Sequence, residues 1–260
     1  MNFNLKNKNA LVCGSTAGIG KATAFLLAEE GAIVTLVARN ADKLKQVCSE
    51  LPNPELHSYI VADFSNPLDL KTKLDVFMSE YHGFHILVNN TGGPAAGPVF
   101  SASLDAFEKA FTQHLKCNHI LAQTVVPFMK DKEFGRIINI ISTSVKQPLD
   151  GLGVSNTIRG AVASWSKTLA NELGGFGITV NNILPGATAT DRLFDILKNT
   201  ATKTGQSEAE VARALKQSIP ANRFAKPEEI ANAIVFLASE QASYINGINL
   251  PIDGGRTKSL

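Results

Sequence analysis

The chain has 260 residues, of which 44% are hydrophobic and 18% charged, with 25 Lys and Arg against 23 Asp and Glu. This ordinary apolar content and the formal net charge of +2 exclude wholesale disorder, and the lack of a Lys/Arg run argues against a dedicated nucleic-acid binder. The length suits one large domain with its own core or two small domains.

Short apolar segments alternate with helical patterns along the whole chain. Seven segments have the apolar, β-branched composition of buried strands: 10–13, 33–38, 58–62, 85–89, 136–141, 178–184 and 247–252. Helical periodicity separates or follows them: 22–29, 42–51, 67–81, 104–130, 155–173, 191–199, 208–217 and 227–239. We predict a single-domain, doubly wound α/β (Rossmann) fold over residues 1–260, in which helices cover both faces of a parallel seven-stranded sheet.

The cysteines, the N-terminus and the histidines indicate the compartment and the kind of partner. Cys13, Cys48 and Cys117 form no CxxC pair and no cluster with histidine, so we expect no disulfide framework and a reducing compartment. The N-terminus lacks the features of a secretory signal, and no apolar run nears the roughly 18 residues of a membrane span. We therefore expect a cytoplasmic protein without a membrane partner, and the five histidines show no metal-site spacing.

A glycine-rich turn, Gly14-Ser-Thr-Ala-Gly-Ile-Gly20, lies between the first predicted strand and the first helix. Glycine permits a tight turn and a close approach of the backbone to a ligand. The N-terminus of the helix that follows offers unpaired N–H groups and partial positive charge to a pyrophosphate. We predict a dinucleotide site here, although a plain connecting turn is the alternative. The residues of this site are Gly14, Ser15, Thr16, Gly18, Ile19 and Gly20.

The end of the second predicted strand indicates which dinucleotide is bound. NAD sites usually place a carboxylate there for the ribose 2′-hydroxyl, whereas an arginine accommodates the 2′-phosphate of NADP. This chain has Arg39 and Asn40 at that point and no carboxylate before Asp42. Because arginine can hold a phosphate through two hydrogen bonds, we predict NADP, with a solvated surface arginine as the alternative.

Further short motifs follow the ends of the other predicted strands. They are Asp63, Asn89-Asn-Thr-Gly92, Asn139-Ile-Ile-Ser142, Val180-Asn-Asn-Ile-Leu-Pro-Gly186 with Thr190, and Asp253-Gly-Gly255. Together with the glycine-rich turn, this set resembles the short-chain dehydrogenase/reductase family from Leu5 to Gly255. Patterns near the C-terminus, such as Pro220-Ala-Asn-Arg223 and Phe236-Leu-Ala-Ser, are most similar to 3-oxoacyl-acyl-carrier-protein reductases.

The resemblance implies further cofactor contacts. Asp63 and Phe64 would lie at the adenine, and Asn89 and Gly92 along the adenine ribose. The nicotinamide amide would be lined by Pro185, Gly186, Thr188 and Thr190. For the asparagines after the fourth strand, a simple strand-ending turn is the alternative, since asparagine tolerates the backbone angles of turns.

The resemblance breaks at the catalytic residues. The family uses a serine after the fifth strand, a tyrosine general acid, a lysine one helical turn further on and usually an asparagine on the preceding long helix. Ser142 keeps the serine, but Ser155 stands at the tyrosine position, Arg159 at the lysine position and His114 at the asparagine position. Serine is a far weaker acid than tyrosine, and arginine keeps the charge of lysine without being able to release a proton.

These replacements leave the proton donor open. We expect Arg159 to hold the nicotinamide ribose and the two serines to bind the substrate oxygen. Histidine titrates near pH 7, so His114 is a candidate proton shuttle, with a purely structural role as the alternative. A water chain is the other route for the proton.

Two functions follow from the site. The first is an NADP-dependent oxidoreductase that interconverts a ketone, such as a 3-oxoacyl thioester, and an alcohol by hydride transfer with a non-standard proton donor. The second is a non-catalytic NADP-binding sensor or assembly protein. Loss of one general acid costs about 10²–10⁴ in rate, and both replaced positions stay polar, which favours the enzyme.

The remaining expectations concern substrate and partners. Residues 187–220 resemble the family's helical substrate lid, with Leu193, Phe194, Ile196 and Leu197 as its candidate apolar face; ordinary helix packing is the alternative. The helices over 104–130 and 155–173 are apolar on more than one face, and by the resemblance they imply a homotetramer. We expect a small carbonyl or alcohol substrate and, for a thioester, an acyl carrier protein as a partner.

Overall fold

The computed structural model describes residues 3–81 and 83–259, and a parallel seven-stranded sheet runs through it in the order β3-β2-β1-β4-β5-β6-β7. The strands are β1 (Asn9–Cys13), β2 (Ile33–Ala38), β3 (Ser58–Val61), β4 (Ile86–Asn89), β5 (Gly135–Ile140), β6 (Ile178–Pro185) and β7 (Asn249–Ile252). The order reverses between β1 and β4, and doubly wound sheets bind ligands at such a point. The predicted fold class is confirmed.

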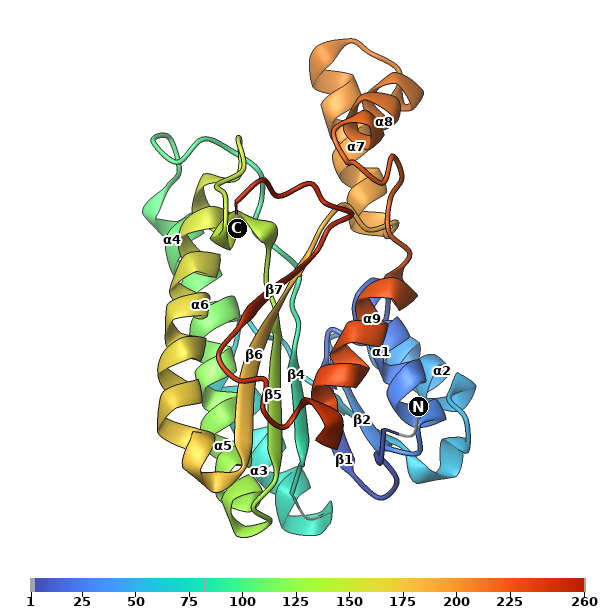
Figure 1. Ribbon diagram of the computed structural model, residues 1–260, viewed down its shortest axis with the longest axis vertical. Coiled ribbons are helices and arrows are strands. Elements are labelled where there is room, and N and C mark those ends of the chain that lie inside the picture. The colour runs from blue at the N-terminus through green and yellow to red at the C-terminus, as the bar shows by residue number, and fades with distance from the viewer. Residues whose placement is uncertain (1–2, 82, 260) are drawn as a thin grey trace.

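Helices cover both faces of the sheet (Figure 1). One face carries α1 (Gly18–Glu29), α2 (Ala41–Glu50) and α9 (Pro227–Ala238), and the other carries α3 (Pro67–Tyr81), α5 (Cys117–Asp131) and α6 (Gly153–Leu173). Each layer packs its own apolar core against the sheet, because the strands present apolar side chains to both faces. In the described ranges no helix has both the length and the apolar character needed to cross a membrane.

The segment predicted as one helix over 104–130 is divided in the structure. α4 (Leu104–Phe111) ends in a single π-helical turn over Thr112–Lys116, after which α5 continues the same path. A π-turn shifts the hydrogen bonds by one residue and is frequent at functional sites. Here the turn carries His114, which is 1% exposed.

The last two helices before α9 project beyond the carboxyl ends of the strands (Figure 1). They are α7 (Asp191–Thr204) and α8 (Glu208–Gln217), so α7 continues past the predicted end at Asn199. The predicted apolar face divides: Leu193 and Leu197 are buried, whereas Phe194 and Ile196 are 51% and 40% exposed. Ordinary helix packing accounts for the first pair, and the second pair is free to meet a ligand.

Four asparagines form a row across the sheet at one register, one each on β4, β5, β6 and β7. Asn89 Nδ2 donates to Asn139 Oδ1 at 2.8 Å, Asn139 to Asn182 at 2.9 Å, and Asn182 to Asn249 at 2.8 Å. Because buried amides need partners, the row ties the carboxyl ends of β4 and β5 to the middle of β6 and the start of β7.

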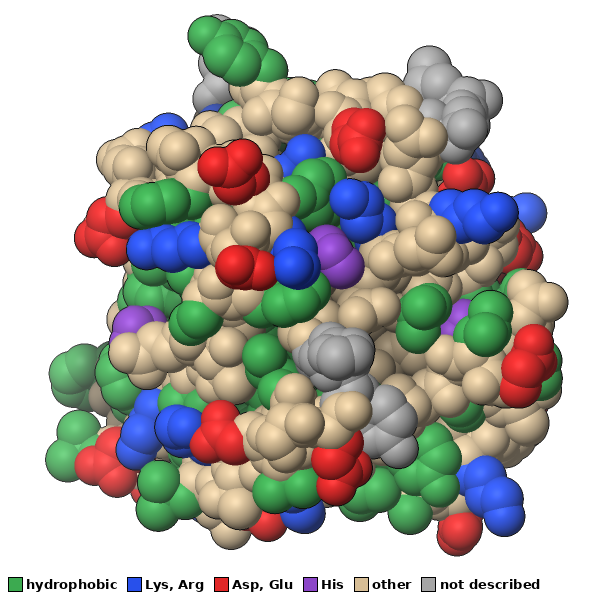
Figure 2. All heavy atoms as spheres, turned by 90° about the horizontal axis from the view of Figure 1, so that it is seen from below, with side chains coloured by type: hydrophobic (Ala, Val, Ile, Leu, Met, Phe, Trp, Pro, Cys, Tyr) green, Lys and Arg blue, Asp and Glu red, His purple; other side chains and the backbone are tan. Residues whose placement is uncertain are grey.

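Arg136 anchors the opposite end of β5 and is 2% exposed. Its guanidinium donates to the carbonyl oxygens of Ser239 at 3.0 Å, Gly135 at 2.8 Å and Gly177 at 3.1 Å, and lies 4.2 Å from the centre of the Phe134 ring. Figure 2 views the molecule from this lower side and shows acidic and basic side chains interspersed over the surface. This end of the sheet thus carries a satisfied buried cation beneath a surface of mixed charge.

Candidate functional site

The glycine-rich turn is packed so closely that it requires glycine. Gly14 and Gly18 have φ of +59° and +54°, in the left-handed region that other residues rarely adopt. A Cβ on Gly14 would lie 2.7 Å from Nδ2 of Asn90, and one on Gly20 would lie 2.1 Å from the Gly14 oxygen. The turn, the start of α1 and the segment after β4 are therefore in direct contact, and Asn90 Nδ2 donates to the Gly14 oxygen at 3.2 Å.

The N-terminus of α1 has the character of an anion site. Within the described residues no side chain caps the helix, whose N-cap is Ala17, and its first turn contains no acidic residue. The N–H groups that an α-helix leaves unpaired at this end are open to phosphate oxygens. A pocket of about 470 Å³ lies beside it, between Gly18 and Thr190. The uncapped N-terminus fits the pyrophosphate of a dinucleotide, and the pocket extends from it along α1 to Pro227 and Glu228 at the start of α9.

The other predicted residues of the turn divide by burial. Ser15 is fully buried, and its hydroxyl accepts a hydrogen bond from the Val37 N–H at 3.1 Å, so its side chain ties the turn to β2. Its backbone is the part left for a ligand. Thr16 and Ile19 are half-buried at the mouth of the turn, where a cofactor can reach them.

The residues predicted at the adenine end follow β2 and β3. Arg39 is exposed, and Asn40, also exposed, caps α2 by accepting from the Lys43 N–H at 2.9 Å. The Ser65 N–H, with the Arg39 charge as a smaller cause, lowers the pKa of Asp63, so this carboxylate is ionised beside the arginine. The Phe64 side chain is only 9% exposed and packs in the core under α3 and α5.

The segment after β6 approaches the glycine-rich turn. A Cβ on Gly18 would lie 2.9 Å from Cγ2 of Thr190, whose Oγ1 caps α7 by accepting from the Leu193 N–H at 3.4 Å. Thr188 Oγ1 donates to the Gly186 oxygen at 3.1 Å. Pro185, Gly186, Thr188 and Thr190 therefore form one wall beside the turn, and Gly92 has open space around it, with nothing within 4 Å of an added Cβ.

Three of the predicted catalytic residues lie at the carboxyl end of β5. Ser142 follows the strand, and its Oγ accepts from the Ser144 N–H at 3.1 Å. Ser155 and Arg159 occupy successive turns of α6 and are 9% and 7% exposed. Arg159 Nη1 donates to the oxygen of Ile140, the last residue of β5, at 2.9 Å. Burial and the charge of Arg192 lower the pKa of Arg159 to about 10, so the guanidinium stays charged at neutral pH.

His114 lies against the segment after β4 and is neutral. Its Nδ1 hydrogen-bonds the Thr91 hydroxyl, and its buried Nε2 has no hydrogen-bond partner among the residues that the structure describes. Burial, with the charges of Arg159 and Arg192, lowers the pKa of His114 to about 2. The expectation that His114 titrates near pH 7 is therefore wrong, because the sequence did not show how deeply the π-turn buries the ring.

Arg192, on the first turn of α7, joins the site and was missed in the sequence. Its guanidinium donates to the carbonyl oxygens of Gly93 at 3.0 Å and Pro94 at 3.1 Å, which bridges α7 to the loop after β4. The one local signal in the sequence is a cation in the first turn of a helix, where it opposes the helix dipole. In the structure a Cβ on Gly93 would lie 2.6 Å from Arg192 Nη2, so a larger residue there would displace the guanidinium.

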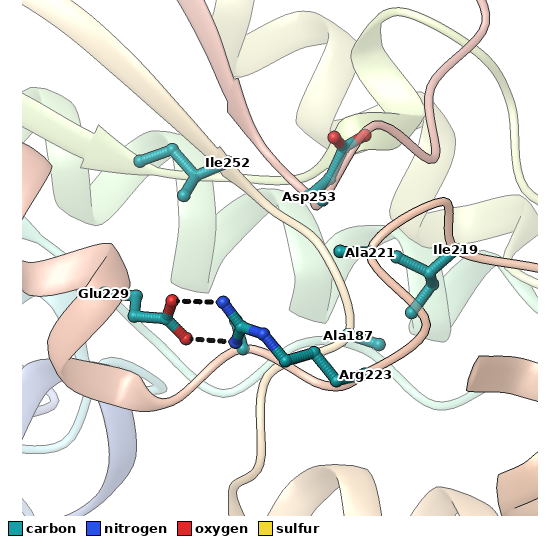
Figure 3. A pocket seen from close by; sticks show the side chains of 9 residues that line it. Ala187, Ile219, Ala221, Arg223, Glu229, Ile252 and Asp253 are labelled. Atoms are coloured by element: carbon teal, nitrogen blue, oxygen red, sulfur yellow. Dashed lines mark hydrogen bonds and ion pairs between the residues drawn. The ribbon is translucent and has the colours of Figure 1, made fainter.

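A second pocket, of about 150 Å³, lies beside the ends of β6 and β7, where Ala187 and Ala225 of its lining adjoin Gly186 and Thr188. Figure 3 shows the ion pair on its wall, in which Arg223 donates to both carboxylate oxygens of Glu229, each at 2.6 Å. The hydrogen bonds from Arg223 hold the pKa of Glu229 at about 2. Arg223 and Glu229 are thus paired with each other, whereas Arg159 and Arg192 donate only to carbonyl oxygens within the described residues.

Comparison with known proteins identifies the family. Residues 14–257 match the family described as enoyl-(acyl carrier protein) reductase. The NADPH-dependent reductase BacG of Bacillus subtilis is 30% identical over 259 residues, which cover 98% of this chain and 100% of that protein. A 3-oxoacyl-[acyl-carrier-protein] reductase of Vibrio cholerae is 32% identical over 255 residues, which cover 97% of this chain and 98% of that protein.

A solved structure extends the similarity to the whole fold. The L-sorbose reductase of Gluconobacter frateurii, in complex with NADPH and L-sorbose, matches with a TM-score of 0.93 at 31% identity and covers 100% of both chains. The prediction of NADP as cofactor is confirmed in that two of these similar proteins are described with NADPH. From the motifs, the fold and these matches, the chain belongs to the short-chain dehydrogenase/reductase family.

Proposed function

We propose that the protein is an NADPH-dependent reductase that converts a ketone into an alcohol. The observation that carries the proposal is the glycine-rich turn beside an uncapped α1, with the cationic Arg39 at the end of the neighbouring strand. NADPH, when bound, supplies the hydride. The protein supplies binding, orientation and charge.

Different residues bind different parts of the cofactor. The backbone of Gly14–Gly20 and the N-terminus of α1 bind the pyrophosphate, and Arg39 binds the 2′-phosphate. Asn89 and Gly92 lie along the adenine ribose, and the wall from Pro185 to Thr190 lines the nicotinamide amide. Arg159 holds the nicotinamide ribose from α6. The buried ring of Phe64 leaves its backbone as the part available at the adenine.

The active site binds the substrate oxygen and stabilises its developing negative charge without a tyrosine. The hydroxyls of Ser142 and Ser155 bind the carbonyl oxygen, and the buried guanidinium of Arg159 stabilises the negative charge that develops there. The product oxygen takes its proton from water, because His114 is neutral and serine is too weak an acid. His114 acts as a positioning residue for the Thr91 hydroxyl.

The substrate and the partners follow from the lid and the relatives. Phe194 and Ile196 are exposed on α7 and suit an apolar chain, such as that of a 3-oxoacyl thioester on an acyl carrier protein. The homotetramer is proposed through α4 and α6, since Leu104 and Phe111 of α4 are 80% and 47% exposed. Apolar side chains of this size exposed on one helix are typical of a subunit contact.

A second candidate function is a non-catalytic NADP-binding protein of the same fold. The neutral state of His114 favours it, because the site then contains no side chain that releases a proton near pH 7. The two candidates share the cofactor and differ in turnover.

A titration of the purified protein with NADPH and NADH tests both, followed by ketones and 3-oxoacyl thioesters while NADPH loss is monitored. We expect tighter binding of NADPH and turnover of a ketone. Gly20→Ala should abolish cofactor binding through its clash with Gly14, and Ser142→Ala should slow turnover while binding is kept. Binding without turnover on every ketone supports the non-catalytic candidate, and no binding contradicts both.

A further inference from the structure

The active site holds two arginines that form no ion pair with another described residue. Arg159 is nine-tenths buried, and its Nε has no hydrogen-bond partner within the described ranges. The ion pairs found between described residues include neither Arg159 nor Arg192. A buried cation without an anion is costly, and its retention points to a ligand that completes the pair.

Arg159, Arg192 and His114 form one electrostatic cluster. Each arginine lowers the pKa of His114, and Arg192 lowers the pKa of Arg159, so the three groups are close enough to affect one another's charge. Asp195 on α7 is the carboxylate that acts on Arg192, and it forms no hydrogen bond to the guanidinium in the described structure. With His114 neutral, the cluster has two positive charges from its arginines.

The guanidinium of Arg192 is accessible to a ligand. It is exposed, in contrast to Arg159, and it reaches from α7 across to Gly93 and Pro94. Carbonyl oxygens accept its hydrogen bonds but carry no net charge, so an anion can still bind the guanidinium. Its place in the first turn of α7 costs helix stability, because the positive end of the helix dipole repels a cation.

The phosphates of the cofactor are accounted for elsewhere. The pyrophosphate site is the N-terminus of α1, and the 2′-phosphate site is Arg39 at the end of β2. The nicotinamide ribose that Arg159 holds is uncharged. The proposed cofactor position therefore leaves the Arg159–Arg192 cluster facing the substrate side of the hydride donor.

We propose that the carbonyl substrate carries a carboxylate and that Arg192, supported by the charge of Arg159, is the specificity-determining residue that binds it. This inference rests on the proposed function, since it places the anion beside the nicotinamide end of a bound cofactor. It predicts a free keto acid as the substrate in place of the 3-oxoacyl thioester, whose acyl carboxyl is esterified. The guanidinium of Arg192 pairs with the carboxylate through charge-assisted hydrogen bonds. Both arginines then gain the counter-charge that no ion pair with a described residue provides.

The test is a binding measurement that does not depend on turnover. Calorimetric titration of the protein saturated with NADP⁺ uses pyruvate and 4-oxopentanoate, each against its methyl ester. We expect at least one acid to bind about tenfold or more tightly than its ester, the effect of one hydrogen bond between charged groups. Raised salt should weaken the acid and not the ester.

Three variants test whether Arg192 causes the preference for the acid over its ester. Arg192→Met should abolish the preference for the acid, and Arg192→Lys should keep part of it. Gly93→Ala keeps the charge but displaces the guanidinium, because its Cβ would lie 2.6 Å from Nη2, and should reduce the preference. The matched control is Lys6→Met, which removes an exposed cation that precedes β1, outside residues 187–220, and should leave the preference intact.

Each other outcome overturns the inference in an identifiable way. Equal binding of acid and ester, or a preference that survives Arg192→Met in a folded protein with unchanged melting temperature, contradicts it. If Arg192→Met instead weakens NADPH itself, and inorganic pyrophosphate competes at Arg192, the anion is the cofactor's phosphate and not the substrate. If wild type binds NADPH without preferring an acid, this inference alone fails; if it does not bind NADPH, the proposed function fails.

Discussion

Arg136 and Arg159 contact opposite ends of β5, and both are more than nine-tenths buried. Arg136, at the amino end, donates to three carbonyl oxygens and stacks on Phe134. Arg159, at the carboxyl end, donates to the oxygen of Ile140 and keeps an unpartnered Nε within the described chain. Burial lowers the pKa of each to about 10, so both carry charge.

The difference separates a structural cation from a functional one. A buried guanidinium whose hydrogen bonds go to main-chain oxygens connects elements of the fold. Arg136 connects the start of β5 to Gly177, which precedes β6, and to Ser239, which follows α9. A buried guanidinium with donors to spare is held ready for a partner from outside. Burial alone does not distinguish the two, whereas the number of satisfied donors does.

The largest effect is expected for Arg159→Met. If the charge serves the substrate and cofactor, kcat/KM for the reduced substrate should fall about 100-fold or more. The free energy of unfolding should change by less than about 1 kcal/mol or rise, because an unbalanced buried charge is removed. Steady-state kinetics measure kcat/KM, and urea unfolding measures the free energy of unfolding. A large loss of stability with unchanged kcat/KM would show that Arg159 is structural, like Arg136.

Arg136→Met should give the reverse result. Three carbonyl oxygens lose their donor, so the free energy of unfolding should fall by about 3 kcal/mol. Cofactor affinity at the other end of the sheet should stay the same once the protein is folded. Urea unfolding and an NADPH titration well below the unfolding transition measure both. Unchanged stability would remove the distinction drawn between the two arginines.

Arg39 extends the comparison to an exposed arginine. Arg39→Ser should weaken NADPH by about 10- to 100-fold and leave NADH within a few-fold, because it removes a charged partner of the 2′-phosphate only. Fluorescence titration of both cofactors measures the ratio. The matched control is Arg213→Met, with an equal loss of charge; a similar drop in that variant would mean a general electrostatic effect.

The smallest effect concerns the pH dependence of stability. The pKa of His114 falls from 6.5 in the unfolded chain to about 2 in the folded protein. The unfolded state alone takes up a proton between these values, so stability is lost as the pH falls below about 6.5. His114→Asn should reduce this loss by about 1 kcal/mol per pH unit. Urea unfolding at a series of pH values checks the slope.

His85 supplies an internal reference for that measurement. Burial, with the charges of Lys8 and Lys132, lowers its pKa to about 4, so its part of the acid sensitivity remains in His114→Asn. If the slope were unchanged, His114 would be protonated in the folded protein and could again act as a proton donor.

The sequence was sufficient for features that depend on local pattern. The strands are apolar on both faces, and their alternation with helices predicted the sheet and its class. Gly14, Gly18 and Gly20 could be identified because the left-handed backbone and the contacts they make demand glycine wherever such a turn occurs. The turn and the strand ends follow from the same local signals, whereas the role of Ser142 was predicted from the family resemblance and stays a prediction.

Other features depend on contacts between distant segments. The π-turn at Thr112–Lys116 leaves the helical periodicity almost unchanged, so 104–130 looked like one helix. The pKa of His114 depends on burial that α4, α5 and α6 produce together. Arg192 is near in space to Gly93 but 99 residues away in sequence, and nothing adjacent to it indicates that contact.

The asparagine row across β4 to β7 has a direction. Asn89, Asn139 and Asn182 each donate to the neighbour on the β7 side, so the three hydrogen bonds point the same way. Aligned hydrogen bonds polarise one another, which makes the acceptor at the start of a row stronger. That acceptor is Asn89 Oδ1, which lacks a partner in the described part of the chain. Among the residues that the structure describes, the row therefore ends in a buried, unpaired acceptor on β4, beside the point where the strand order reverses between β1 and β4.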